Sequence, residues 1–143
     1  NHLTKEQLKE YSFLFLMIYH TESALLKIED LAAIEFSSEI TNNFKNEIID
    51  HLSKGFDSHN IILKINDEFK ELVNEIQKNS NLKNIINKKN NEEKVEFIDE
   101  LLQDMKLMNQ LKKIEYLERK VANNLDENSY SELIKLKSQI NRE

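Results

Sequence analysis

The most hydrophobic stretch of the chain lies near its beginning. Residues 11–19 read Tyr-Ser-Phe-Leu-Phe-Leu-Met-Ile-Tyr, and a helix that is apolar nearly all round is typical of a buried position. Thr4, with Gln7 three residues later, is typical of a capping box at the start of a helix. The pattern therefore predicts a helix over residues 4–20 at the centre of a bundle.

A clear amphipathic pattern runs between Ser38 and Gly55, where large apolar residues recur every four positions and so share one face of a helix. Serine is a preferred N-cap, and glycine is the preferred residue just beyond a helix end. We therefore predict a helix that begins at Ser37 or Ser38 and stops at Gly55, the only glycine of the chain. Its apolar face comprises Ile40, Phe44, Ile48, Ile49 and Leu52.

Shorter apolar clusters on either side of that segment predict short helices. In the first of these, over residues 22–28, we expect Leu25, Leu26 and Ile28 to face inward. The others are predicted over residues 31–35 with Asp30 as cap, 58–65, 68–78 with Asp67 as cap, and a last turn at 82–86.

The most polar stretch, residues 87–93, marks a predicted domain boundary. It separates a helical bundle at residues 1–88 from a second part at residues 89–143. In the second part a helical pattern runs unbroken from about residue 92 to 124, a length of about 50 Å at ~1.5 Å per residue. Residues 126–128 then predict a tight turn, and 129–142 a final helix. The expected fold is all-α, a globular multi-helix bundle followed by a C-terminal helical hairpin with one long arm.

The apolar face of the long arm rotates midway. Four successive steps of three residues lead from Met105 to Leu117, which places these two side chains about 120° apart around the helix axis. We therefore expect the first half of the arm to pack on the bundle or on another chain. The second half is expected to pack on the final helix through Tyr130, Leu133, Ile134, Leu136 and Ile140.

Composition narrows the class of protein. The 143 residues include one Gly, no Pro and no Cys, which excludes turn-rich β folds, disulfides, cysteine-based zinc sites and thiol nucleophiles. No apolar run is long enough for a membrane span. The net charge is −6, with 11 Lys against 14 acids in residues 1–89 and 9 bases against 12 acids in residues 90–143. Each part thus has a charge of −3, and we expect no direct binding of duplex DNA. The first residue is Asn rather than Met, which suggests a fragment of a larger protein.

The chain shows no catalytic signature. It has no glycine-rich phosphate loop and no His-Glu-x-x-His motif, and its four histidines are not paired at helical spacing. We expect His20 at a helix end and His51 and His59 at surface or boundary positions. Pairs of carboxylates are common in a chain with 26 acids and indicate a solvated face. We therefore expect no catalytic, metal or cofactor-binding residue, with a small helical enzyme using a carboxylate site as the remaining catalytic alternative.

A two-helix arm cannot bury both of its faces against itself, so the hairpin is expected to expose apolar groups to a partner. Tyr130 is the first candidate, because Tyr is favoured at the centres of interfaces. The alternative role for Tyr130 is to close the hairpin.

Three stretches carry a resemblance to a known family. The first is Tyr11 to Leu31, and the second is Leu31-Ala-Ala-Ile-Glu-Phe36 with the serine-capped helix through Leu52. The third is Lys113-Ile-Glu-Tyr-Leu-Glu118 through the turn to Leu133-Ile-Lys-Leu-Lys137. In these stretches the chain resembles the C-terminal, helicase-binding domain of bacterial DnaG-type DNA primase.

The resemblance implies that the hairpin docks on the N-terminal domains of the replicative DNA helicase and that the bundle modulates helicase activity. The parent would synthesise RNA primers at the bacterial replication fork in the cytoplasm. Its polymerase and zinc domains, with zinc and magnesium as cofactors, would lie outside this chain. The partner-binding residues would lie on the hairpin at the i, i+3, i+4 and i+7 spacing of a helix that enters a groove. They are Leu125, Tyr130, Leu133, Leu136, Lys137 and Ile140.

The chain departs from the family at two places. Thr21 stands where relatives often have Pro after the first helix. Some relatives use basic residues at the start of the bundle to bind the acidic tail of single-stranded-DNA-binding protein, whereas here Lys5 and Lys9 alternate with Glu6 and Glu10. That partnership is therefore a weaker expectation than helicase binding.

Two other functions remain open. The N-terminal domain of the replicative helicase has a similar bundle-and-hairpin shape. The long helix could also pair with its copy in a coiled-coil dimer, although the rotation of its apolar face near Met108 counts against a long regular coiled coil. The helicase-binding function predicts a monomer or a weak dimer.

Overall fold

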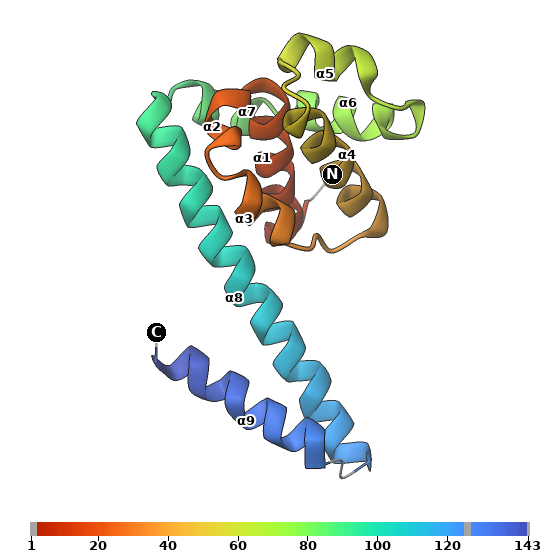
Figure 1. Cartoon of the computed structure of the whole chain (residues 1–143), viewed down its shortest axis with the longest axis vertical. Coiled ribbons are helices and arrows are strands. Elements are labelled where there is room, and N and C mark those ends of the chain that lie inside the picture. The colour runs from red at the N-terminus through yellow and green to blue at the C-terminus, as the bar shows by residue number, and fades with distance from the viewer. Residues whose placement is uncertain (1–2, 125–126, 143) are drawn as a thin grey trace. The chain divides into compact units, whose positions relative to one another are not determined.

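A computed structural model gives the fold of residues 3–124 and 127–142. Within these two ranges every regular element is a helix and none is a strand (Figure 1), which confirms the predicted all-α class with a bundle and a C-terminal hairpin. The elements are α1 (Lys5–Tyr19), α2 (Thr21–Leu25), α3 (Ile28–Ala33), α4 (Glu39–Ser53), α5 (Ser58–Lys64), a 3₁₀ turn η1 (Asp67–Phe69), α6 (Lys70–Lys78), α7 (Ser80–Asn87), α8 (Asn91–Asn124) and α9 (Glu127–Arg142).

The chain forms two compact units, which we name the bundle unit (Asn1–Leu102) and the hairpin unit (Gln103–Glu143). The division falls inside α8, so the first turns of that helix belong to the bundle unit. The boundary predicted from the polar stretch, between residues 88 and 89, lies instead just before α8 begins. The polar stretch thus marks the end of one helix rather than the end of the compact unit.

Helix α1 is the centre of the bundle unit, as its apolar pattern predicts. Residues 10–18 are all buried, and the helix contacts α2, α4, α5 and α7. Its start is fixed by the predicted capping box. The backbone N–H of Gln7 donates to the Thr4 hydroxyl at 3.0 Å, and the Gln7 side chain accepts from the Thr4 N–H at 2.9 Å.

Two buried charged side chains hold the connection between α3 and α4. The Lys45 ammonium, on α4, donates to the carbonyl oxygens of Leu31 (3.0 Å), Ala32 (3.4 Å) and Ile34, which close the C-terminal end of α3. The Glu10 carboxylate, on α1, accepts from the backbone N–H of Ser37 at 2.6 Å and from its hydroxyl at 3.0 Å. Burial lowers the pKa of Lys45, an effect that the nearby Glu35 partly offsets.

Helix α4 begins and ends where the sequence predicts. The Ser38 hydroxyl accepts from the Thr41 N–H at 3.2 Å, and Gly55 follows the helix with φ of 83°, a left-handed conformation that favours glycine. Ile40 is an exception on the predicted apolar face, because it is exposed in the first turn.

The region of α2 and α3 corrects the sequence prediction. Helix α2 ends at Leu25, its buried residues are Ser23 and Ala24, and both Leu25 and Leu26 are exposed rather than inward. A five-residue helix presents only one narrow face to its neighbours, and here the small residues occupy that face. Helix α3 begins earlier than predicted, so Asp30 lies in its first turn instead of capping it.

Three other helices each begin two residues away from the predicted position. Asp67 lies inside η1, and the α-helical segment begins at Lys70 rather than at residue 68. The predicted last turn at residues 82–86 is a full helix, α7, whose cap Asn79 accepts from the Leu82 N–H at 3.0 Å. Helix α9 begins at Glu127, within the turn predicted at residues 126–128.

The beginning of α8 packs within the bundle unit. Ile98 and Leu101 are buried, and Asp99 forms an ion pair of 2.9 Å with Lys27. Ile114 and Leu117 are buried further along, in the core of the hairpin. The apolar face of α8 thus changes partner along its length, as its rotation predicts.

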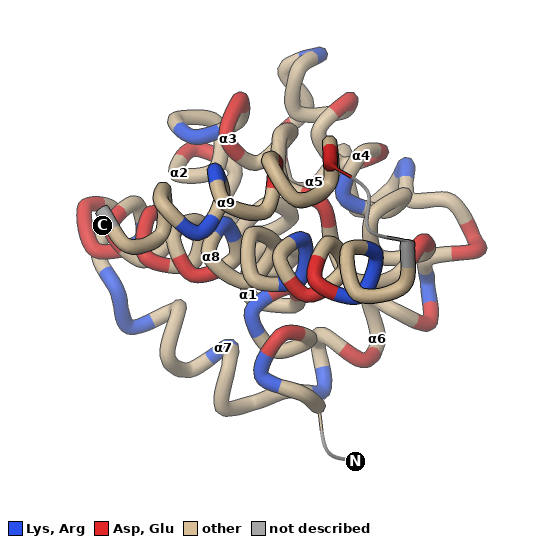
Figure 2. Tube along the Cα trace, turned by 90° about the horizontal axis from the view of Figure 1, so that it is seen from below, with Lys and Arg blue, Asp and Glu red and all other residues tan. Residues whose placement is uncertain are grey.

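Charged residues of both signs are interspersed along the helices of each unit (Figure 2). Several form local pairs at helical spacing, including Lys54 with Asp50 at 2.9 Å and Arg119 with Glu115 at 3.2 Å. Exposed pairs of this kind contribute little to stability. No helix within residues 3–124 or 127–142 is long and apolar enough to cross a membrane.

Candidate partner-binding surface on the hairpin

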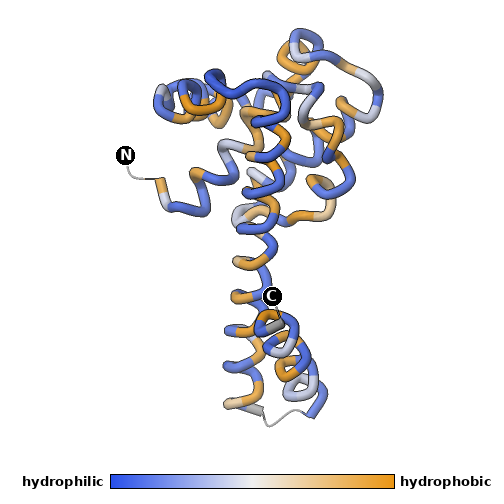
Figure 3. Tube along the Cα trace, turned by 90° about the vertical axis from the view of Figure 1, so that its left-hand side faces the viewer, coloured by the Kyte–Doolittle hydropathy of each residue, from blue (hydrophilic) through white to orange (hydrophobic). Residues whose placement is uncertain are grey.

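The hairpin unit is held together by a small apolar core. Ile114 and Leu117 from α8 and Leu133 from α9 are buried against one another. Partly buried side chains extend this core along both helices, and hydrophobic residues recur on each of them (Figure 3). The extending residues are Val121, Leu136 and Ile140.

The structure divides the predicted partner-binding residues into two groups. Leu133 is only 7% exposed, and Leu136 and Ile140 pack against the same core. These three side chains therefore hold the two helices together, and a partner would reach them only indirectly. Tyr130 and Lys137 are exposed. Leu125 lies outside the residues that the structure describes.

One face of α9 combines the exposed members with Ile134, which the sequence analysis assigned to the contact with the long arm and not to the partner-binding residues. Tyr130 is 54% exposed and Ile134 is 48% exposed, and with Lys137 they have i, i+4 and i+7 spacing, which places all three on one face of the helix. We name these three residues the Tyr130 face. The exposure of Tyr130 and Ile134 corrects the expectation that both pack on the long arm. Their spacing of four residues is the signal that places them on one shared face.

Within residues 3–124 and 127–142, Lys137 forms a single ion pair, which is a loose one. Its Nζ lies 3.9 Å from the Glu118 carboxylate, and both side chains are about half exposed. A pair with this geometry contributes at most about 1 kcal/mol. Lys137 can therefore exchange Glu118 for an acidic group of a partner at little cost.

Helix α8 also exposes large apolar side chains within the hairpin unit. Leu107 and Leu111 are one turn apart and exposed, ahead of the buried Ile114. Tyr116 is exposed as well, with the Lys113 ammonium 5.8 Å from its ring centre. A hairpin with so small a core therefore presents apolar groups on both helices, which is typical of a partner-binding element.

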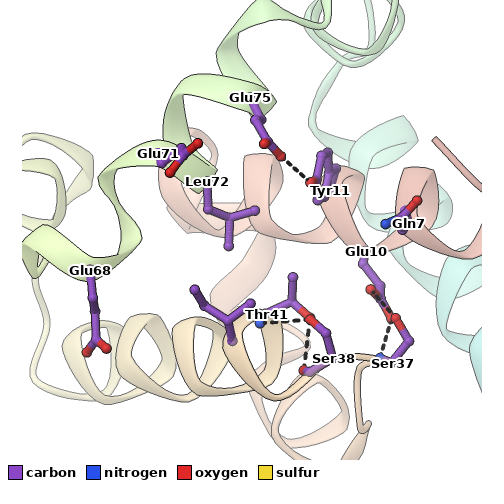
Figure 4. Close-up of a pocket in the computed structure, with 11 residues that line it drawn as sticks. Gln7, Glu10, Tyr11, Ser37, Ser38, Thr41, Glu68, Glu71, Leu72 and Glu75 are labelled. Carbon is purple, nitrogen blue, oxygen red and sulfur yellow. Dashed lines mark hydrogen bonds between the residues drawn. The ribbon is translucent and has the colours of Figure 1, made fainter. Parts of the chain in front are cut away.

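The bundle unit contains a pocket of about 360 Å³ that is rich in carboxylates (Figure 4). The Tyr11 hydroxyl donates to the Glu75 carboxylate at 2.6 Å. Burial, the hydrogen bond to Glu75 and the negative charges of Glu75 and Glu10 raise the pKa of Tyr11, so its hydroxyl stays protonated at neutral pH. At this pocket Tyr11 thus links α1 to α6. The contact between Glu10 and Ser37 links α1 to the segment that precedes α4.

Potential metal ligands are dispersed. Among the residues that the structure describes, no group of three or more His, Asp or Glu side chains is arranged to hold a metal ion. His20 caps the C-terminal end of α1, as predicted, and its Nε2 lies 3.0 Å from the Asn87 side-chain oxygen. Burial lowers the pKa of His20, the hydrogen bond to Asn87 opposes this shift, and the charge of Lys94 adds to it.

His51 and His59 have different environments. His59 is exposed. The ring of His51 stacks on Phe56 with 5.4 Å between ring centres, and its two ring nitrogens are buried without a hydrogen-bond partner among the described residues. His51 as a whole is only half-buried, which fits the predicted boundary position.

Comparison with known proteins adds no relative. No family model, no curated protein and no solved structure matches this chain. Its function therefore has to follow from its own residues.

Proposed function

We propose that this chain is the non-catalytic, helicase-binding C-terminal domain of a bacterial DnaG-type DNA primase. In this function the hairpin unit binds the N-terminal domains of the replicative helicase and so couples RNA primer synthesis to the replication fork. The polymerase and zinc domains of the parent, with their magnesium and zinc, belong to other parts of the protein.

The observation that carries the proposal is the Tyr130 face on a separate hairpin unit. A helix that offers an aromatic and an aliphatic side chain one turn apart is suited to a groove between helices of a partner. Tyr130 and Ile134 provide this pair, and both are accessible without any change in the hairpin core. The three stretches that resemble the family include the segment that carries Ile134 and Lys137.

The chemistry of binding follows from the exposure of these side chains. Tyr130 and Ile134 would lose water on binding, and this loss supplies most of the affinity. Lys137 would lie at the rim, where a charge affects association rate and orientation more than affinity. The buried residues of the hairpin core fix the angle between α8 and α9, which keeps the Tyr130 face ordered before it meets its partner.

Calorimetric titration with the N-terminal domains of the cognate replicative helicase tests the proposal. The whole chain should bind, and a version that ends at Leu102 should not, because it lacks the hairpin unit. Absence of binding by a folded whole chain would refute the proposal. If the shortened version binds as well as the whole chain does, the contact lies on the bundle unit instead.

The same samples separate the two remaining alternatives. Sedimentation should show a monomer or a weak dimer at the concentrations used for titration. A stable dimer that dissociates when Leu107 and Leu111 are changed to Ser would favour self-association. If this chain binds primase rather than helicase, the alternative that it is the N-terminal domain of the replicative helicase would be favoured.

A further inference from the structure

The bundle unit has an apolar hollow that its own fold leaves open. It has a volume of about 470 Å³ and lies between α2 and the first turns of α8. Leu26 and Val95 contribute its apolar wall, and Glu22, Glu92 and Glu96 contribute carboxylates around it. The volume is within the usual range for binding pockets, about 300–1,000 Å³.

Leu26 is the clearest sign that the hollow has a role outside the fold. Its side chain is 72% exposed, although its sequence pattern predicts an inward position. The next residue, Lys27, is fixed by its ion pair with Asp99 on α8, so the backbone at Leu26 is anchored close to α8. Transfer of this exposed side chain from water to an apolar contact would be favourable.

The charge around the hollow is negative and unneutralised. Glu22, Glu92 and Glu96 are exposed, and within the described residues none of them forms an ion pair or a hydrogen bond. The nearby Lys27 is engaged elsewhere, because it pairs with Asp99. The hollow therefore combines an apolar wall with three free carboxylates.

We propose that this hollow is a docking site for an amphipathic segment of a partner protein, in which one or two large apolar side chains are flanked by Lys or Arg. The apolar side chains would cover Leu26 and Val95, and the basic side chains would meet Glu22, Glu92 and Glu96. We name this site the α2–α8 groove. It lies entirely in the bundle unit and does not depend on helicase binding by the hairpin.

The negative charge around the α2–α8 groove favours a basic segment over nucleic acid, anionic lipid or a second copy of the chain. Nucleic acid and anionic lipid are repelled by the three carboxylates. A second copy of the chain has a net charge of −6 and so approaches the groove less favourably than a basic segment does. Complementary charge also predicts that affinity falls as salt rises.

Fluorescence anisotropy with the whole chain and a short helical peptide tests the proposal. The probe peptide has two leucines one turn apart with lysines at the neighbouring positions. One control peptide has glutamates in place of the lysines, and another has serines in place of the leucines. We expect the probe to bind and both controls to bind at least about tenfold more weakly.

Matched variants separate the groove from general attraction between an acidic chain and a basic peptide. Glu92→Lys with Glu96→Lys should weaken binding of the probe about tenfold or more. Glu68→Lys with Glu71→Lys makes the same change in net charge at exposed positions outside the groove and should have little effect. Leu26→Ser should abolish binding, whereas Leu63→Ser, on α5 and 69% exposed, should not. Circular dichroism checks that each variant is folded.

Three results would overturn the proposal. The first is no preference for the probe over its two control peptides. The second is equal weakening by both charge-reversed pairs, which would show non-specific attraction. The third is a dimer of the whole chain that Leu26→Ser dissociates, which would make a second copy the occupant.

Discussion

The Nζ atom of Lys45 on α4 donates a hydrogen bond of 3.0 Å to the carbonyl oxygen of Leu31 on α3, and the Lys45 side chain is only 1% exposed. A buried ammonium is stable only when its hydrogens are bonded. Here the partners are backbone carbonyls at the end of a helix, where the helix dipole is negative. This contact, together with that of Glu10 and Ser37, fixes the path from α3 to α4.

Replacement of Lys45 by Met should destabilise the bundle unit by about 2–3 kcal/mol, because the buried carbonyl oxygens lose their donor. The free energy of unfolding in urea measures this effect. Lys88→Met, at an exposed position, is the control and should change stability by less than about 0.5 kcal/mol. Equal effects of the two substitutions would contradict the capping role of Lys45.

The contact between Glu10 and Ser37 predicts a coupling that a double-mutant cycle measures. Glu10→Gln and Ser37→Ala should each destabilise the chain, and the double variant should lose less than the sum of the two. The expected coupling is about 1–2 kcal/mol, as for a buried hydrogen bond to a charged group. Strict additivity would show that the two side chains stabilise the fold independently.

His20 predicts a dependence of stability on pH. Because burial lowers the pKa of His20 below the ordinary value of 6.5, the unfolded chain binds this proton more tightly than the folded chain does. The contribution of His20 to the free energy of unfolding is therefore complete above pH 6.5 and is lost as pH falls toward the lowered pKa. Urea unfolding at a series of pH values should show this loss, and His20→Gln should lack it. The same slope in both proteins would mean that other groups are responsible.

Neighbouring residues of α9 should behave in opposite ways. Leu133→Ala removes a buried side chain from the hairpin core and should destabilise it by about 2–3 kcal/mol, with faster hydrogen exchange of the amides of α9. Ile134→Ala removes a side chain that is nearly half exposed and should leave exchange almost unchanged. If Ile134→Ala accelerates exchange as much as Leu133→Ala does, the assignment of these two residues to core and surface is wrong.

The fold is largely predictable from the sequence, because the periodicity of apolar residues and the capping residues indicate where helices form. The uninterrupted apolar run of α1, the stop at Gly55 and the rotating apolar face of α8 each identified a feature that the structure contains. Periodicity reports which residues share a face, whereas it does not report how much of that face the neighbours cover. Leu25 and Leu26 were therefore expected inside, although α2 is too short to bury them.

The candidate sites were less predictable, because they depend on contacts between segments distant in sequence. From the sequence alone, Lys45 and Glu10 cannot be distinguished from solvent-facing charges, because the segment between α3 and α4 is what buries them. On α9, the sequence could not decide whether Leu133 faces α8 or a partner, and it wrongly placed Ile134 against α8, although Ile134 is 48% exposed. The α2–α8 groove is formed by residues about 70 positions apart in sequence, so no local pattern identifies it.

The affinity of the whole chain for the N-terminal domains of its replicative helicase, measured for the native sequence and for Tyr130→Ala with Ile134→Ala, tests the central proposal most directly. Both substitutions lie on the surface of α9, so the hairpin should stay folded in the variant. We expect the native chain to bind and the double variant to bind at least about tenfold more weakly. Unchanged affinity in a folded double variant would contradict the role of the Tyr130 face, and no binding by the native chain would contradict the proposed function itself.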